Sequence, residues 1–397
     1  MLVQNVKHYS PLYFLAALGP GGLAVSFFMY LMFLVPHKGT PMAAMEHWLP
    51  IVAQGGISSI LILLVLSIVL ALAILHFTLL GWNFKQFRQF KNSDDINQLR
   101  SSNAAVTEMA MPLTVSMSIN MGFILGSLFV PNLWQFIQPV FPVATLGFLS
   151  VGVWALTIYG RFLTNVVMAG KFNPDANTNF SQLLAPFTFS MVAVGLAAPG
   201  AMSHSTLVSG VSLTLAVMFG VLAAVTTVIW LINGFSQIVK NGLDLNGSPT
   251  LWILIPILTL LGITYVRYTM GTHHNFVAPL INSQFITVMG AILGLQLFVG
   301  LFGLKAMKRN SYFAEFVSGD KTNPATFGLV CPGVALVVFG FFFVNYALIG
   351  NAIIVKYSLA NFILLLPILV LQLKTTAVMF KLMGKTVFNL EKNVKTA

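Results

Sequence analysis

The chain has few charged residues. Only 7% of its 397 residues are Asp, Glu, Lys or Arg, whereas 57% are hydrophobic. Soluble domains carry about 25% charged residues, and a soluble chain of this composition would expose large apolar patches to water. The scarcity of charge therefore excludes a soluble globular domain and predicts an all-α integral membrane protein.

Cysteine and acidic residues are also scarce. A single cysteine, Cys331, rules out a disulfide within the chain. Only nine residues are acidic, and of these only Glu108 is expected near a membrane segment. Proton pumps usually need buried carboxylates, and hydrolases need a nucleophile, a base and an orienting group. These shortages argue against an enzyme and disfavour a proton pump. Glu108 remains open as a pathway residue or as an interfacial or capping residue.

Histidines give no clear metal site. His76 has no acidic neighbour in sequence and is interpreted as a packing residue. The run Thr272-His273-His274 has metal-binding side chains, but no second ligand cluster accompanies it. We therefore expect neither a metal nor another cofactor.

The N-terminus "MLVQNVKHYS" is weakly basic and lacks a small-residue cleavage pattern, so the first apolar run is interpreted as a retained helix. The net charge of +11 lies in loops beside apolar runs. That placement indicates contact with lipid headgroups and not with nucleic acid.

Ten apolar runs are long enough to cross a bilayer, which requires about 20 residues each. They form one transmembrane domain over residues 1–397, with "GWNFKQFRQFKNSDDINQLRSSNAAV" as its longest loop, expected to be a solvated connector. The expected helices cover residues 11–35, 51–80, 106–130, 133–160, 179–201, 205–235, 249–270, 278–304, 324–349 and 355–384.

The basic residues predict the orientation. With ten crossings, 17 of the 20 Lys and Arg residues fall on the side of the two termini. Because basic loops stay in the cytoplasm, both termini are predicted to be cytoplasmic, in a multi-pass protein of the cell inner (plasma) membrane.

One proline recurs in every odd-numbered helix: Pro20, Pro112, Pro186, Pro256 and Pro332. This spacing predicts five parallel helical hairpins. A proline removes a backbone donor and bends a helix, and freed carbonyls need partners that lipid lacks. We therefore expect kinked odd helices in an inner pore ring and even helices in an outer ring. The alternative is that proline is simply common in membrane helices.

The expected pore wall is neutral. Ser26, Thr114, Ser116, Ser118, Thr188, Ser190, Thr259 and Thr264 would supply weakly coordinating hydroxyls, although such residues also bridge helices. Candidate pore-lining or kink residues are Gly19, Pro20, Gly21, Met111, Pro112, Asn120, Ala185, Pro186, Ile255, Pro256, Cys331 and Pro332.

Two cations lie near helix ends. Arg267 either attracts anions to an outer mouth or extends to lipid headgroups. Lys374 is interpreted as an anchor to headgroups.

The ten helices, the cytoplasmic termini and the motifs "GPGGLA", "LLAPFTFSMVAVGLAAPG" and "CPGVAL" resemble the tellurite-resistance/dicarboxylate transporter family. That family includes bacterial tellurite-resistance protein A, the plant slow anion channels and fungal sulfite exporters. The resemblance implies a homotrimer with one pore in each subunit, plugged by a phenylalanine near the proline of the ninth helix. Here Cys331 precedes Pro332, so Phe327, Phe187 and Phe189 are the gate candidates.

The leading hypothesis is an anion channel or exporter that passes halide, nitrate, sulfite, tellurite or small carboxylates. The alternative is a proton- or sodium-coupled secondary transporter of an organic or inorganic anion.

Overall fold

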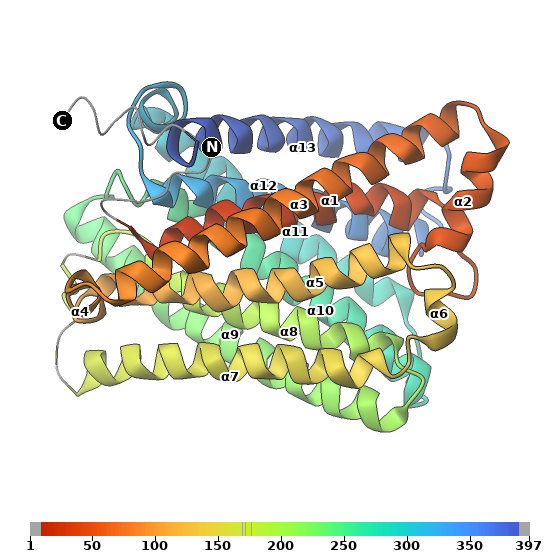
Figure 1. Cartoon of the computed structure of the whole chain (residues 1–397), viewed down its shortest axis with the longest axis horizontal. Coiled ribbons are helices and arrows are strands. Elements are labelled where there is room, and N and C mark those ends of the chain that lie inside the picture. The colour runs from red at the N-terminus through yellow and green to blue at the C-terminus, as the bar shows by residue number, and fades with distance from the viewer. Residues whose placement is uncertain (1–8, 169, 171, 176, 389–397) are drawn as a thin grey trace.

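Ten helical spans dominate the structure (Figure 1). The computed structural model describes residues 9–168, 170, 172–175 and 177–388, and every regular element within them is helical. Ten of these segments are long and apolar enough to cross a membrane. The prediction of an all-α membrane protein with ten spans is therefore confirmed.

The odd-numbered spans share a local design. Each begins with a short 3₁₀ helix that runs directly, or after one residue, into an α-helix. The odd spans are η1 Pro11–Tyr13 with α1 Phe14–Leu34, η2 Asn103–Met109 with α5 Ala110–Phe129, η3 Ser181–Leu183 with α8 Leu184–Met202, η4 Ser248–Trp252 with α10 Leu254–Asn275, and η6 Pro324–Leu329 with α12 Val330–Phe342 and the π-helix η7 Phe343–Ile349.

The even-numbered spans are single long α-helices. They are α3 Ile57–Lys91, α7 Val140–Val167, α9 Thr206–Asn241, α11 Asn282–Arg309 and α13 Leu359–Thr386. Shorter elements connect the spans: α2 Met45–Gln54, α4 Asp95–Arg100, α6 Leu133–Phe136 and the π-helix η5 Phe313–Ser318.

Several expected boundaries differ from the structure. At the basic-residue side, the second, fourth and sixth spans continue to Lys91, Val167 and Asn241 instead of residues 80, 160 and 235. Two starts differ for local reasons. The second span starts at Ile57 and not at residue 51, because Gly55 and Gly56 adopt φ values of 75° and 89° that end α2 and separate it from α3. The fourth span starts at Val140 and not at residue 133. The residues before it form the separate turn α6, and Pro139 caps α7.

The expected solvated connector between the second and third spans is mostly helical. The helix α3 continues to Lys91, and α4 and η2 follow it closely. The side chain of Ile96 on α4 is only 4% exposed. An amphipathic pattern therefore packs this segment against the bundle, and the prediction of a loop was wrong.

Odd and even spans differ in burial. In the most apolar window of each span, 78, 50, 100, 61 and 67% of residues are buried for the odd spans, against 33, 44, 33, 17 and 22% for the even spans. Among the odd spans, α1 contacts α5 and α12, α8 contacts α5 and α10, and α10 contacts α12. Each odd span also contacts the even span that follows it.

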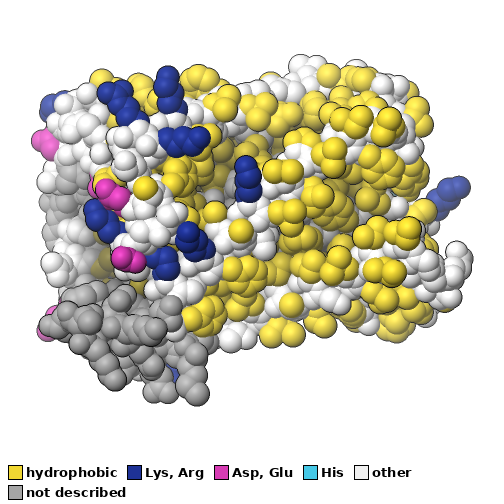
Figure 2. Space-filling view, turned by 90° about the horizontal axis from the view of Figure 1, so that it is seen from above, with side chains coloured by type: hydrophobic (Ala, Val, Ile, Leu, Met, Phe, Trp, Pro, Cys, Tyr) yellow, Lys and Arg dark blue, Asp and Glu magenta, His cyan; other side chains and the backbone are white. Residues whose placement is uncertain are grey.

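Charge gathers at one end of the molecule. Figure 2 shows Lys and Arg side chains concentrated at the end drawn on the left, and mainly hydrophobic side chains over the rest of that face. We call this the basic end; the odd spans begin there, and the opposite end is the far end. The predictions for the two terminal segments cannot be compared with the structure, because these segments lie outside the described residues, as do Lys7, Lys171, Lys392 and Lys395. Lys374 is exposed on α13.

The repeated prolines mark helix starts more than helix kinks. Pro112, Pro186, Pro256 and Pro332 each occupy the third position of an α-helix that follows a 3₁₀ helix. The first four N–H groups of a helix have no intrahelical partner, so proline is tolerated there. Only Pro20 lies deeper, at the seventh residue of α1.

A close approach explains one glycine of "GPGG". A Cβ on Gly21 would lie 2.7 Å from His76 Nδ1 and 2.8 Å from Met117 Cγ, whereas a Cβ on Gly19 would have no neighbour closer than 3.4 Å. Gly21→Ala is expected to destabilise the protein by about 1–3 kcal/mol of overpacking, partly offset by about 1 kcal/mol of helix propensity. Thermal unfolding in detergent measures this, with Gly19→Ala as the matched control. Equal unfolding midpoints for the two variants would contradict the close packing.

Candidate permeation pathway

A cavity of about 160 Å³ opens between the odd spans toward the far end. Every residue that lines it belongs to α1, α5, α8, α10 or α12, except Met42, which lies in the loop between α1 and α2. On each helix the lining positions recur every three or four residues, as in Pro256, Leu260, Ile263 and Arg267 on α10. One face of each odd span therefore forms the wall. We call this space the outer cavity.

A second cavity, of about 230 Å³, lies at the basic end. Residues that begin the five odd spans, or directly precede them, line it. Polar side chains at its wall include Asn179, Ser181, Asp244 and Asn323. We call this space the inner cavity.

Three residues belong to the walls of both cavities: Phe187 on α8, Pro256 on α10 and Cys331 on α12. They mark the boundary between the two spaces. The Phe187 side chain is only 4% exposed and supplies the largest apolar group at this boundary. We call these three residues the constriction.

Of the described residues that line the outer cavity, only Arg267 is charged. Its Nη1 donates to the carbonyl oxygen of Val194 at 2.8 Å, and within the described residues it makes no ion pair with a carboxylate. The other polar groups bond to backbone, since Asn120 donates to Ser116 O at 3.2 Å and Thr259 donates to Ala335 O at 3.2 Å. Within the described residues the other guanidinium donors of Arg267 have no hydrogen-bond partner, so the side chain lines the cavity without a counter-charge.

An acidic residue, Asp244, lies in the wall of the inner cavity. Its carboxylate accepts hydrogen bonds from the backbone N–H groups of Asn246 and Gly247, both at 3.0 Å, and from Asn179 Nδ2 at 3.3 Å. Hydrogen bonds to an ionised carboxylate are stronger than those between neutral groups. Asp244 therefore shapes the turn before η4 and places a negative charge, stabilised by these donors, in the wall of the inner cavity.

The predicted lining residues divide into two groups. Gly19, Asn120, Pro256, Cys331, Pro332, Phe187 and Arg267 line one cavity or both. Pro20, Gly21, Met111, Pro112, Ala185, Pro186 and Ile255 do not line either cavity; all seven are buried in the helix packing.

Two gate candidates lie away from the cavities. Phe327 in η6 and Phe189 on α8 are fully buried and line neither space. The Phe189 ring packs against Tyr159 of α7, with centroids 5.4 Å apart. Phe189 lies two residues from Phe187, so the two point to different sides of the helix. Of the three candidates, the structure places Phe187 at the constriction.

The wall of the outer cavity is mainly apolar and not hydroxyl-rich as expected. Of the eight candidate hydroxyls, only Thr259 lines a cavity. Others connect helices: Thr114 Oγ1 donates to Phe14 O at 3.1 Å, and Thr188 Oγ1 donates to Met109 O at 2.9 Å. Helix bridging, the ordinary role of Ser and Thr in membranes, accounts for these residues.

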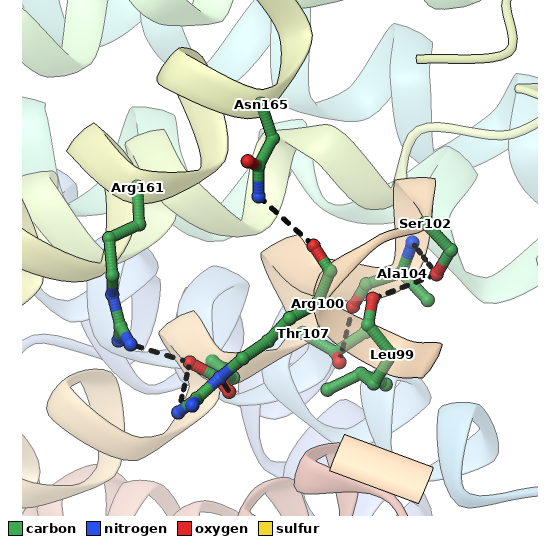
Figure 3. Close-up of polar contacts among 8 residues, drawn as sticks. Leu99, Arg100, Ser102, Ala104, Thr107, Arg161 and Asn165 are labelled. Atoms are coloured by element: carbon green, nitrogen blue, oxygen red, sulfur yellow. Dashed lines mark hydrogen bonds and ion pairs between the residues drawn. The ribbon is translucent and has the colours of Figure 1, made fainter. Parts of the chain in front are cut away.

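Glu108 is a structural ion-pair partner. Its carboxylate lies 2.7 Å from Arg100 Nε and 3.3 Å from Arg161 Nη2, and its side chain is 3% exposed. Figure 3 shows the Arg100 and Arg161 side chains converging at this point. Glu108 lines neither the inner nor the outer cavity, so an interfacial role fits it better than a pathway role.

His76 is fully buried behind the wall of the outer cavity. Its Nδ1–H donates to the carbonyl oxygen of Ala17 at 2.7 Å, three residues before Pro20, and its Nε2 lies 2.8 Å from Ser118 Oγ. The imidazole therefore joins α3 to α1 and α5, as expected of a packing histidine.

Histidines at the far end form pairs and not larger clusters. His204 Nδ1 lies 3.0 Å from His274 Nε2, while His273 Nδ1 donates to Ala278 O at 2.8 Å. His37 lies in the loop after α1, and burial is the main cause that lowers its pKa. Within the described part of the chain, no group of three or more His, Cys, Asp or Glu side chains is placed to hold a metal.

Several wall residues were not predicted, among them Met117, Met191, Val194, Ile263 and Val338. The available signal was helical periodicity, because each lies one or two turns from a predicted residue on the same helix face, such as Asn120, Phe187 or Cys331. Comparison with known proteins adds no further residue. No protein-family model, no curated protein and no solved structure matches this chain.

Proposed function

We propose that the chain passes small anions through the outer cavity, the constriction and the inner cavity. The observation that carries this proposal is that two cavities, lined mainly by the odd spans and the residues directly before them, share Phe187, Pro256 and Cys331. Arg267, which makes no ion pair within the described residues, lies in the outer wall. In this proposal the odd spans are the inner pore ring and the even spans the outer ring of five hairpins. The contacts among the odd spans and their higher burial support it.

Two features favour negative solutes. Arg267 places a cation in a wall that holds no acid, and such a charge raises the local concentration of anions. The 3₁₀ helices η3, η4 and η6, which begin three of the odd spans, contribute Ser181, Thr250 and Ala325 to the inner cavity. Helix N-termini carry partial positive charge, which opposes the negative charge of Asp244 in the same wall.

The proposed substrates are halide, nitrate, sulfite, tellurite and small carboxylates, by resemblance to the tellurite-resistance/dicarboxylate transporter family. The same resemblance proposes a homotrimer with one pore in each subunit. The basic end would face the cytoplasm of a cell inner membrane by the positive-inside rule.

Reconstituted liposomes test this function. Purified protein should release chloride, nitrate or sulfite down their own gradients, and the flux should persist when ionophores collapse proton and sodium gradients. Empty liposomes and a heat-unfolded sample give the background. Flux no greater than this background for every anion would reject the proposal.

A proton-coupled carrier is the second candidate, and His76 is the observation that favours it. It is a buried titratable group hydrogen-bonded to Ala17 and Ser118 beside the outer cavity. Coupling would make anion uptake depend on a proton gradient and would be lost in His76→Gln. Gradient-independent flux that is unchanged in this variant would reject coupling and leave the channel.

A further inference from the structure

A third cavity, of about 300 Å³, lies at the basic end between α7 and the segment of α4 and η2. Arg100, Glu108 and Arg161 contribute to its wall together with Ala105, Ile158 and Phe162. It shares no lining residue with the inner or outer cavity. It is therefore a separate site, which the permeation pathway does not use.

The charges in this cavity do not balance. Two arginines share one carboxylate, with Nε of Arg100 2.7 Å from Glu108 Oε1 and Nη2 of Arg161 3.3 Å from Glu108 Oε2. The carboxylate is almost fully buried, while the arginine side chains are 34% and 50% exposed. The cluster thus carries a net positive charge on the side that remains accessible.

The arginines also retain free donors. Arg161 bonds to Glu108 through Nη2 alone, so its Nε and Nη1 have no partner within the described residues. Asn165 Nδ2 donates to the carbonyl oxygen of Arg100 at 3.1 Å and fixes α4 against α7 (Figure 3). Two guanidinium groups held on different elements suit the several oxygens of one phosphate.

The position of the cavity along α7 and its apolar wall favour the phosphate of a lipid headgroup over free phosphate. Arg161 lies six residues before the end of α7, which is about 9 Å along the helix axis. Since α7 has 28 residues and the bilayer core needs about 20, this position falls near the headgroup boundary. Ile158 and Phe162 give the cavity an apolar floor.

We propose that this cavity binds the phosphate of an anionic phospholipid in the leaflet at the basic end. The guanidinium groups of Arg100 and Arg161 hold the phosphate oxygens. Glu108 orients both arginines without neutralising them, and the apolar floor accepts the first carbons of the lipid tails. The bound lipid thereby joins α4 and η2, which lead into α5, to α7.

Native mass spectrometry of the full-length protein tests this site, with phosphatidylglycerol, phosphatidylcholine and inorganic phosphate as the probes. Wild-type protein should retain phosphatidylglycerol in preference to phosphatidylcholine. Arg161→Gln should weaken retention about fivefold, as expected for about 1 kcal/mol per basic residue near a membrane surface. Arg161→Lys, which keeps the charge but loses the planar donors, should weaken it less.

Arg88→Gln is the matched control. Arg88 is an exposed cation in the last turn of α3, also at the basic end, but it does not line this cavity. It should leave retention unchanged. Three results would overturn the proposal: equal retention in Arg161→Gln and wild type, equal losses in Arg161→Gln and Arg88→Gln, or displacement of the lipid by equimolar inorganic phosphate. The last would indicate a site for free anions. Should Arg161→Gln fail to fold, the lipid preference of the wild type and the effect of Arg100→Gln decide the question.

Discussion

Phe187→Ala is expected to raise anion flux through the reconstituted protein by roughly tenfold, the change that about 1.4 kcal/mol off a barrier produces. The ring of Phe187 is the largest apolar group shared by the walls of both cavities. An apolar constriction of this kind opposes passage by excluding water. Truncating the ring joins the two cavities and admits water, so ions cross with fewer lost hydration contacts. Fluorescent anion-flux assays or bilayer currents measure the change.

The other two gate candidates are the controls for this result. Phe327 and Phe189 are as buried as Phe187 but line neither cavity. Phe327→Ala and Phe189→Ala should lower stability, as truncations in a core do, without raising flux per folded protein. If Phe327→Ala raised flux and Phe187→Ala did not, the constriction would have to lie elsewhere.

Arg267→Gln is expected to remove most of the preference for anions over cations, with anion flux at low salt falling by roughly tenfold or more. Among the residues that the structure describes, Arg267 is the only charge in the outer wall, and its only hydrogen-bond partner is the Val194 carbonyl. Without it the outer cavity has only apolar side chains and polar groups already bonded to backbone. Reversal potentials in asymmetric salt measure the preference directly.

Arg267→Lys and ionic strength provide the controls. The lysine keeps the positive charge and should keep most of the preference. The loss in Arg267→Gln should shrink as salt rises, since salt screens attraction over distances beyond the Debye length. A loss of equal size at low and high salt, or an unchanged reversal potential, would assign Arg267 a packing role through Val194.

The spans and their division into two classes were predictable from the sequence. Long apolar runs need a membrane, so the ten spans follow from composition and length. The proline in each odd span identified the more buried helices, because four of these prolines lie at a 3₁₀-to-α junction that recurs in the fold.

The loops were predicted less well. Short amphipathic pieces such as α4 have no membrane-length signal, and the two glycines before Ile57 end α2 through their positive φ values.

The identity of the wall residues was less predictable, because a sequence of nearly uniform hydrophobicity does not fix the rotation of a helix about its axis. Phe187 and Phe189 illustrate this: two residues apart, one lies at the constriction and the other packs on Tyr159. Most of the predicted hydroxyl residues do not line a cavity, for a related reason. Thr114 and Thr188 satisfy carbonyls of neighbouring helices, a demand that the sequence does not show. Arg267, by contrast, stood out as a rare cation beside an apolar run.

The lone cysteine offers the most direct test of the permeation pathway. Cys331 is the only cysteine in the chain and belongs to the walls of both cavities. A small methanethiosulfonate reagent that modifies it should add a group at the constriction and stop anion flux in the wild type. Flux through Cys331→Ser should be insensitive to the same treatment. Complete modification of Cys331, verified by intact mass, with undiminished anion flux would contradict a pathway through this point.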